Sequence, residues 1–282
     1  MQVIFNADDF GGSPSINSAV VLAHQQGVLT SSSLMVTGPA MEQAVCMAEK
    51  NPSLAVGLHL VAVSGTAVLP PKEVPHLVDS QGRFLNNAAL AGLRYFFSKV
   101  IKEELAREIT AQFERFAETG LPLSHVDGHL HMHVHPTIFN LVLPLAAQYG
   151  ARGLRLPRDD ARLALRYDAK HVGTKILWAV VFGLLSRWCS RQMETHPLVL
   201  TQNVYGLMQS GQMHEHYVVN LLNQLSVKSA EIYFHPDLET RTHALGPNHL
   251  DFETLVSPRI RRLVEERGLI LATYPTLQGI GG

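Results

Sequence analysis

The sequence predicts an α/β fold in which seven or eight β-α units form a TIM-like barrel. Short apolar runs alternate with longer segments of helical period, which is the pattern of a mainly parallel sheet surrounded by helices. Polar residues stand at the ends of several runs, where a parallel barrel gathers its active site. The 282 residues, 46% of them hydrophobic, can bury the core of one such barrel, so we expect a single domain over 1–282.

The predicted strands are short runs of aliphatic and β-branched residues, which favour a pleated sheet. They lie at 2–7, 31–37, 54–60, 124–131, 153–157, 199–204, 230–235 and 269–274. Apolar residues recur between them with the period of a helix. This period predicts helices at 15–27, 40–50, 100–118, 136–149, 173–191, 212–225 and 255–267. The stretch at 61–85, rich in proline and glycine, predicts a long loop beside a substrate groove.

A run of histidines is the first sign of function. Five histidines and one aspartate occupy every odd position from 125 to 135. On a strand these side chains share one face, but alternate residues are about 6.6 Å apart, so they cannot all reach one metal ion. Some of them must contact the ligands or the substrate instead. We expect the strand to end near His131 and a helix to begin at Pro136, because proline suits the first turn of a helix.

Four other polar residues end predicted strands. Asp8 and Asp9 follow the first strand, while His59 and His235 end two later ones. Each has an ordinary explanation by itself, since aspartates cap turns and a lone histidine in an apolar strand is often a core residue. Their joint occurrence at strand ends favours a metal-dependent active site.

Composition excludes several other classes of protein. A net charge of −1, spread along the chain, leaves no basic surface for nucleic acid. Cys46 and Cys189 are far apart, which excludes a thiolate metal site and suits a reducing compartment. The first residues lack the pattern of a leader peptide, so we expect a cytoplasmic protein that associates with the membrane surface.

Several segments resemble the YdjC-like carbohydrate deacetylases in order and approximate spacing. They are NADDFG at 6–11, IN at 16–17, GVLTSSSLMVTGPA at 27–40, GLHL at 57–60, HVDGHLHMH at 125–133 and FHP at 234–236. The resemblance implies a distorted barrel, similar in its site chemistry to NodB-like polysaccharide deacetylases. It also implies that the protein removes acetyl groups from N-acetylated sugars, and the pattern looks closest to the hopanoid-biosynthesis-associated branch.

The resemblance assigns roles to the polar residues at the strand ends. Asp9, His59 and His129 match the metal ligands, Asp8 the catalytic base and His235 the acid. The arginine that steadies the base in the NodB-like group has two candidates, Arg155 and Arg158. Further residues expected to contact the ligands or the substrate are Asn17, Asp127, His131, His133 and Arg158.

The chemistry of these residues is consistent with amide hydrolysis. An aspartate and two histidines leave coordination positions for water and for the acetyl oxygen of a substrate. An adjacent carboxylate can take a proton from the water, and an acid can protonate the departing amine. The resemblance implies Mg²⁺, whereas these ligands equally suit Zn²⁺, Co²⁺ or Ni²⁺. We therefore expect one divalent ion.

An apolar segment bears on the substrate. Residues 176–185 are almost all apolar, and we expect a helical insertion at 170–195. The run is shorter than the roughly 20 residues that span a bilayer. It suits a buried helix or a homodimer interface, or else a lid in which Trp178 and Phe182 contact an N-acetylated glycolipid at the membrane surface. By the branch resemblance that lipid is an N-acetylglucosaminyl hopanoid.

Two other functions compete with deacetylation. Asp127, His129 and His131 resemble the Asp-x-His-x-His strand of amidohydrolase-like metal hydrolases, although that motif normally ends the first barrel strand. A non-catalytic carbohydrate- or lipid-binding protein with a structural metal is the other alternative. It would need neither Asp8 nor His235, which favours an enzyme.

Overall fold

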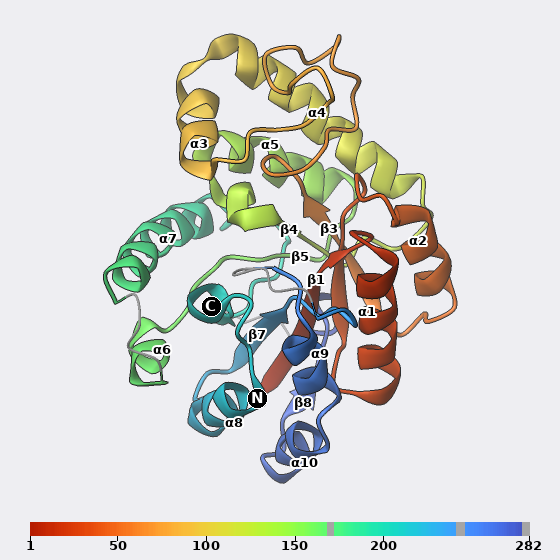
Figure 1. Ribbon diagram of the computed structural model, residues 1–282. Coiled ribbons are helices and arrows are strands. Elements are labelled where there is room, and N and C mark those ends of the chain that lie inside the picture. Colours follow the sequence, from red (N-terminus) through yellow and green to blue (C-terminus); the bar gives the residue numbers. More distant parts are fainter. Residues whose placement is uncertain (168–171, 241–245, 278–282) are drawn as a thin grey trace.

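The computed structural model describes residues 1–167, 172–240 and 246–277. Its centre is a curled parallel sheet in the order β5-β4-β3-β2-β1-β7-β6, which forms a half-barrel (Figure 1). In the described ranges a single bridge, between Gly153 and Val199, links its two outer edges. The strands are β1 (Gln2–Phe10), β2 (Ser31–Leu34), β3 (Ala55–Leu60), β4 (His125–Gly128), β5 (Gly153–Leu154), β6 (Asn203–Tyr205), β7 (Ser229–Phe234) and β8 (Ile270–Leu271), which pairs with the start of β1.

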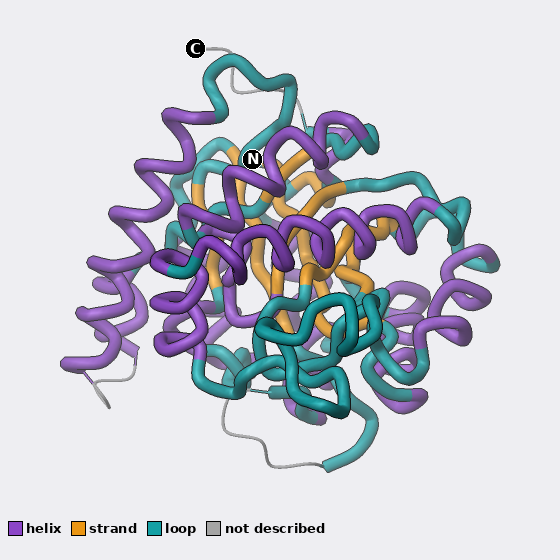
Figure 2. The backbone as a smooth tube through the Cα atoms, turned by 90° about the horizontal axis from the view of Figure 1, so that it is seen from above, coloured by secondary structure: helices purple, strands orange, loops and turns teal. Residues whose placement is uncertain are grey.

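Helices surround the strands, as the view in Figure 2 shows. They are α1 (Pro14–Gln26), α2 (Met41–Glu49), α3 (Ala88–Phe97), α4 (Lys99–Ala117), α5 (Pro136–Gln148), α6 (Ala161–Tyr167), α7 (Val172–Gln192), α8 (Glu215–Gln224), α9 (His249–Val256) and α10 (Pro258–Glu266). Three short 3-10 helices are η1 (His129–Val134), η2 (Leu207–Gln209) and η3 (Tyr274–Thr276). The predicted α/β class and distorted parallel barrel architecture are thereby confirmed, and the sheet takes the form of a half-barrel.

Local sequence explains where the helices next to the site begin. The hydroxyl of Ser13 accepts a hydrogen bond from the backbone N–H of Ile16, so α1 starts directly after the loop that ends β1. Pro136 occupies the first turn of α5, as predicted, because that turn needs no backbone donor from it. These two boundaries fix the segments that follow Asp9, at the end of β1, and His129, at the start of η1.

The structure corrects several predicted boundaries. The strand predicted at 124–131 ends at Gly128, and η1 follows it. The helix predicted at 255–267 begins at Pro258, because Ser257 caps α10 and Pro258 cannot continue the hydrogen bonds of the preceding helix, α9, most of which was not predicted. Helices α3 and α6 were not predicted.

The predicted loop at 61–85 contains neither a helix nor a strand, and α4 holds it in place. The Glu108 carboxylate accepts the backbone N–H groups of Val68 and Leu69. The Glu104 carboxylate accepts those of His76 and Leu77 in the same way. Two buried acidic side chains therefore replace the backbone hydrogen bonds that a strand would have supplied.

Helix α7 forms within the expected segment 170–195 and connects β5 to β6 together with α6. Only 17% of its most apolar stretch is buried, so it is not a core helix. Residues 170 and 171 of the expected segment lie outside the described residues. Length and composition alone would allow α7 to cross a membrane.

Candidate metal centre and active site

The end of β1 turns two adjacent carboxylates toward the buried interior. The pairing of β1 with β2 shifts register between Ala7 and Phe10, and Asp9 has a left-handed φ of 63°. Such bulges redirect side chains next to active sites. As a result Asp8 and Asp9 both face the interior, at 2% and 6% exposure, although neighbours on a regular strand point to opposite faces.

Asp9 lies against two histidines from other strand ends. Its Oδ1 atom is 3.4 Å from His59 Nε2 and 3.2 Å from His129 Nδ1. This buried oxygen has no hydrogen-bond partner among the described residues. Burial favours a raised pKa for Asp9, but the two histidines outweigh it and hold the pKa well below its usual range.

The spacing of these three groups fits a divalent ion. Donors bound to one ion at about 2.0–2.2 Å lie roughly 3–3.5 Å apart, which matches the two measured contacts of Asp9. Two further acidic groupings, around Asp127, are hydrogen-bonded internally and to Arg155. The set formed by Asp9, His59 and His129 therefore fits a metal best, and the identity of the ion is open.

Asp127 orients the imidazole of His59. Its Oδ1 atom lies 2.8 Å from His59 Nδ1, so the ring donates there and turns Nε2 toward Asp9. Burial would lower the pKa of His59, but the charge and hydrogen bond of Asp127 raise it to about 9. The other Asp127 oxygen accepts a hydrogen bond of 2.6 Å from Ser33. Asp127 is thus hydrogen-bonded to His59, one of the three residues expected to bind the metal.

The histidine run divides after Gly128. Leu130 and His131 have left-handed φ values of 50° and 55°, so η1 sends successive histidines in different directions. His129, at 22% side-chain exposure, faces Asp9 and meets solvent. The His131 ring instead hydrogen-bonds the Tyr233 hydroxyl at 2.9 Å. The expectation that the run continues as a strand to His131 is wrong, and the two histidines do not share a ligand set as an amidohydrolase would require.

The buried histidines of this run are held neutral. Burial lowers the pKa of His125 and of His133 to about 4, and it lowers that of His131 as well. His133 donates to the backbone carbonyl of Arg155 at 2.9 Å. His131 is 8% exposed, while the other two are fully buried. Their positions make them supports for the site.

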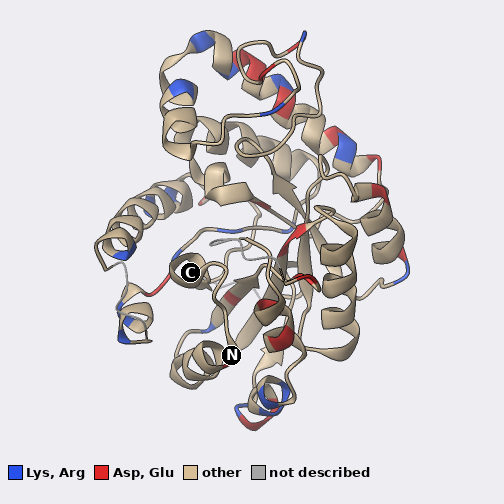
Figure 3. Ribbon diagram, viewed as in Figure 1, with Lys and Arg blue, Asp and Glu red and all other residues tan. Residues whose placement is uncertain are grey.

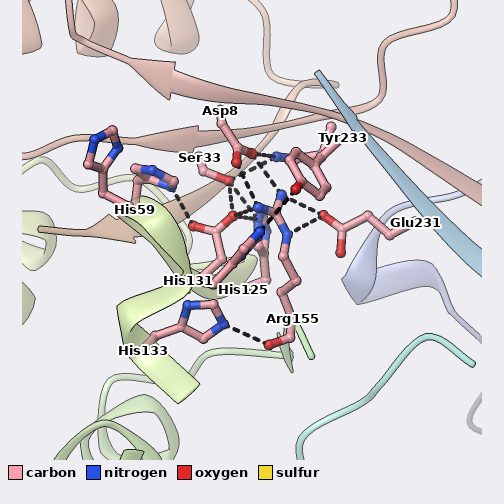
Figure 4. Close-up of polar contacts among 12 residues, drawn as sticks. Asp8, Ser33, His59, His125, His131, His133, Arg155, Glu231 and Tyr233 are labelled. Carbon is pink, nitrogen blue, oxygen red and sulfur yellow. Dashed lines mark hydrogen bonds and ion pairs between the residues drawn. The ribbon is translucent and has the colours of Figure 1, made fainter. Parts of the chain in front are cut away.

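Arg155 is fully buried and joins three carboxylates (Figure 4). Its Nη1 and Nη2 atoms each lie 2.8 Å from a different oxygen of Asp8. Nη1 also lies 2.9 Å from Asp127, and Nη2 donates to Glu231 at 2.7 Å. Burial disfavours its charge, but the carboxylates outweigh this and raise the pKa of Arg155 well above its usual value. The guanidinium thereby neutralises Asp8 but does not reach Asp9.

His235 approaches Asp8 from the end of β7. Its Nε2 atom lies 4.0 Å from Asp8 Oδ2, and its side chain is 12% exposed. Its backbone N–H donates to Asp251 at 2.9 Å, which fixes the chain where β7 ends. The site therefore combines a carboxylate, an imidazole and three candidate metal ligands, and it opens to solvent at the partly exposed His129 and His235.

Other predicted residues lie farther from this opening. Asn17 is fully buried and accepts the backbone N–H of Gly11 at 2.7 Å, so it holds the loop after β1. Arg158 lines a separate cavity of about 390 Å³ with Phe182. Phe182 meets the His131 ring edge to face at 5.6 Å, and Trp178 packs in a small cluster beside it. Of the two arginine candidates, Arg155 contacts Asp8.

Sequence reasoning missed five polar supports of the site. Asn6 donates to Asp8 at 2.9 Å, and Tyr274 donates to Glu231 at 2.6 Å. Glu231 is an acidic residue in an otherwise apolar strand, which could have marked it. Ser33 and Tyr233 carried no such signal, because serine and tyrosine are common in strands.

The chain is similar to proteins named as carbohydrate deacetylases. The chain is 45% identical over 149 residues to a carbohydrate deacetylase from Brevibacillus brevis, which is 53% of the chain and 57% of that relative. It is 31% identical over 265 residues to a carbohydrate deacetylase from Vibrio campbellii, with 92% and 98% covered. The first match thus spans less than two thirds of the relative.

A solved structure is also similar along the whole chain. It is an Enterococcus faecalis protein named for cellobiose-phosphate cleavage, with a TM-score of 0.76, 25% identity and 98% of both chains covered. The family model of YdjC-like proteins matches residues 2–266. The chain therefore belongs to the YdjC-like protein family.

Proposed function

We propose that the protein hydrolyses the N-acetyl group of an N-acetylglucosamine-containing glycan or glycolipid, giving acetate and a free amino sugar. The observation that carries this proposal is the placement of Asp8 and His235, 4.0 Å apart, beside the set of Asp9, His59 and His129. A base and an acid next to a metal site are what amide hydrolysis needs. The names of the relatives support the same activity.

Asp9, His59 and His129 would hold one divalent ion. When bound, such an ion lowers the pKa of water and polarises the acetyl carbonyl. Nitrogen-rich ligands favour Zn²⁺, Co²⁺ or Ni²⁺, whereas the resemblance to deacetylases favours Mg²⁺. Metal analysis of protein purified without added salts decides between them.

Asp8 and His235 would divide the proton transfers. Asp8, held by both nitrogens of Arg155, accepts a proton from water as the new C–O bond forms. His235 donates a proton to the amide nitrogen as the C–N bond breaks, because this nitrogen is a poor leaving group until it gains a proton. Arg155 is fully buried, so it acts as a positioning residue.

The specific substrate that we propose is an N-acetylglucosaminyl hopanoid. Phe182 of α7 contacts His131, so an apolar helix lies beside the opening that holds the ligand set. An oligosaccharide would gain little from such a surface, whereas a lipid aglycone would pack against it. Comparing hydrolysis of the glycolipid with hydrolysis of a chito-oligosaccharide tests this choice of substrate.

Acetate release by the purified protein from N-acetylglucosaminyl substrates tests the reaction. Asp8→Asn should reduce turnover by about 10²–10⁴-fold while ion binding persists. His129→Ala should lose both turnover and ion binding. The control Glu114→Gln, on the exposed side of α4, should resemble the wild type in both measurements. Full activity in the first two variants would contradict the mechanism. Stabilisation by metal without hydrolysis of any such substrate would favour a binding protein instead.

A further inference from the structure

Among the described residues, three helices and η1 carry nearly all of the large apolar side chains that face solvent. The described part of the chain exposes fifteen such side chains, and twelve of them lie on α3, the start of α4, η1 and α7. We name these twelve the apolar face. They are Leu90, Leu93, Phe96, Phe97, Val100, Leu130, Val172, Ile176, Leu177, Val180, Val181 and Leu184.

The elements of the apolar face adjoin one another. η1 contacts both α3 and α7, and Figure 1 shows the two helices on the same side of the barrel. Exposed apolar surface gathered in this way marks an interaction site, because scattered residues would be the ordinary case. The face is therefore a docking surface.

Helix α7 lies along the protein and does not stand free. Its Ser186 hydroxyl donates to the backbone carbonyl of Pro157 at 3.3 Å. Trp188 meets Phe139 of α5 edge to face at 5.6 Å, and Phe182 meets His131. One side of α7 is thus packed on the barrel, which suits a helix that lies on a bilayer better than one that crosses it.

Positive charge accompanies the apolar face. Helix α7 contains no aspartate or glutamate, as Figure 3 also shows. Arg187 and Arg191 are exposed and continue the line of Val180 and Leu184 at helical spacing. Lys102 of α4 lies over the ring of Phe96 of α3, 5.5 Å from the ring centre. Basic groups beside apolar ones complement anionic lipid headgroups.

The apolar face also adjoins the opening of the candidate metal centre. η1 carries His129, the exposed member of the ligand set, and next to it Leu130, which is 43% exposed. A surface that rests on Leu130 would therefore lie close to the opening. A substrate held in a bilayer at this position could reach Asp9, His59 and His129 without leaving the bilayer.

We propose that the apolar face docks the protein on a lipid bilayer that contains anionic phospholipids. This inference rests on the proposed function, because docking would present a membrane-held glycolipid to the site. A second copy of the chain fits less well, since α7 offers no carboxylate to pair with Arg187 and Arg191 of its copy.

Vesicle flotation tests the docking without any hydrolysis. The wild-type protein should float with vesicles of phosphatidylcholine and phosphatidylglycerol, and less with phosphatidylcholine alone. Leu184→Glu, at a side chain 61% exposed, should weaken binding about tenfold or more. Leu250→Glu on α9, at a residue 50% exposed and outside the face, is the matched control and should bind as the wild type does.

Three results would overturn the proposal: absence of wild-type flotation, unchanged flotation of Leu184→Glu, or a dimer in solution that Leu184→Glu dissociates. Arg187→Gln combined with Arg191→Gln should reduce binding to the anionic vesicles only. Activity on a soluble N-acetylated oligosaccharide should be equal in Leu184→Glu and wild type. If the wild type released acetate from neither the soluble oligosaccharide nor the N-acetylglucosaminyl glycolipid, deacetylation would be refuted and the docking result would stand.

Discussion

Arg155 binds Asp8 through two parallel hydrogen bonds of 2.8 Å, although the two residues are 147 positions apart in the chain. The planar guanidinium matches the two carboxylate oxygens and fixes the plane of the Asp8 side chain. The same group also contacts Asp127, which orients His59. One buried side chain thus connects the proposed base to a proposed metal ligand.

Arg155→Lys should reduce turnover by about 100-fold, because a single ammonium cannot hold both oxygens of Asp8 and a small displacement of a catalytic group is costly. KM should change little, since Arg155 is buried and does not face the substrate. Steady-state kinetics measures both constants. Arg158→Lys serves as the matched control, and an equal loss there would show that the contact with Asp8 is not responsible.

Asp127→Asn should weaken metal affinity by about 10–100-fold. Asparagine can still accept from His59, but it lacks the negative charge that strengthens His59 as a ligand. Titration with Zn²⁺ against a competing chelator measures the effect. A Zn²⁺ affinity equal to that of the wild type would mean that the charge of Asp127 does not strengthen His59 as a ligand. Circular dichroism should show that the variant folds.

The ion-free protein should lose stability as pH rises from about 6.5 to about 9. Burial would lower the pKa of His59, but Asp127 raises it from 6.5 to about 9, so the charged pair is fully formed only below the lower value. Above it, the unfolded chain releases the His59 proton first and stability falls. Thermal unfolding in chelator across this pH range measures the decline. The decline of stability with pH should be smaller in Asp127→Asn.

Gly57→Ala should destabilise the fold by about 1–3 kcal/mol. A Cβ atom at Gly57 would lie 2.4 Å from the His125 ring, which is fully buried. Gly183→Ala on α7 is the control, because a Cβ there meets nothing within 4 Å and alanine favours a helix. The free energy of unfolding in urea should therefore fall in Gly57→Ala and rise in Gly183→Ala. A stabilised Gly57→Ala would contradict the close contact with His125.

The repeated alternation of apolar runs and helical segments was enough to predict a barrel-like α/β fold with a mainly parallel sheet, whereas its half-barrel form came only from the structure. It failed where the backbone departs from regular geometry. Leucine and histidine are residue types that do not indicate a left-handed φ, so the left-handed backbone at Leu130 and His131 was not predicted. The predicted end of β4 therefore came too late in the chain. The break between α9 and α10 was readable from Ser257 and Pro258, but the continuous apolar period concealed it.

The candidate site was predictable to the extent that strand ends carry it. Asp8, Asp9, His59, His129 and His235 all end strands or follow them, and parallel strands bring such residues together. Arg155 could be named only together with Arg158, because a short irregular segment does not show which of them turns inward. Asn6 and Ser33 escaped because their roles depend on contacts between strands, which no local pattern records.

The left-handed backbone at Asp9 also limits what can replace this residue. Asparagine is among the few non-glycine residues that adopt that conformation readily, and it matches the volume of aspartate. Asp9→Asn should therefore keep the shape of the cavity while removing its one charged metal ligand. This catalytically inactive variant with an intact site would be suited to binding an uncleaved acetylated sugar for crystallography.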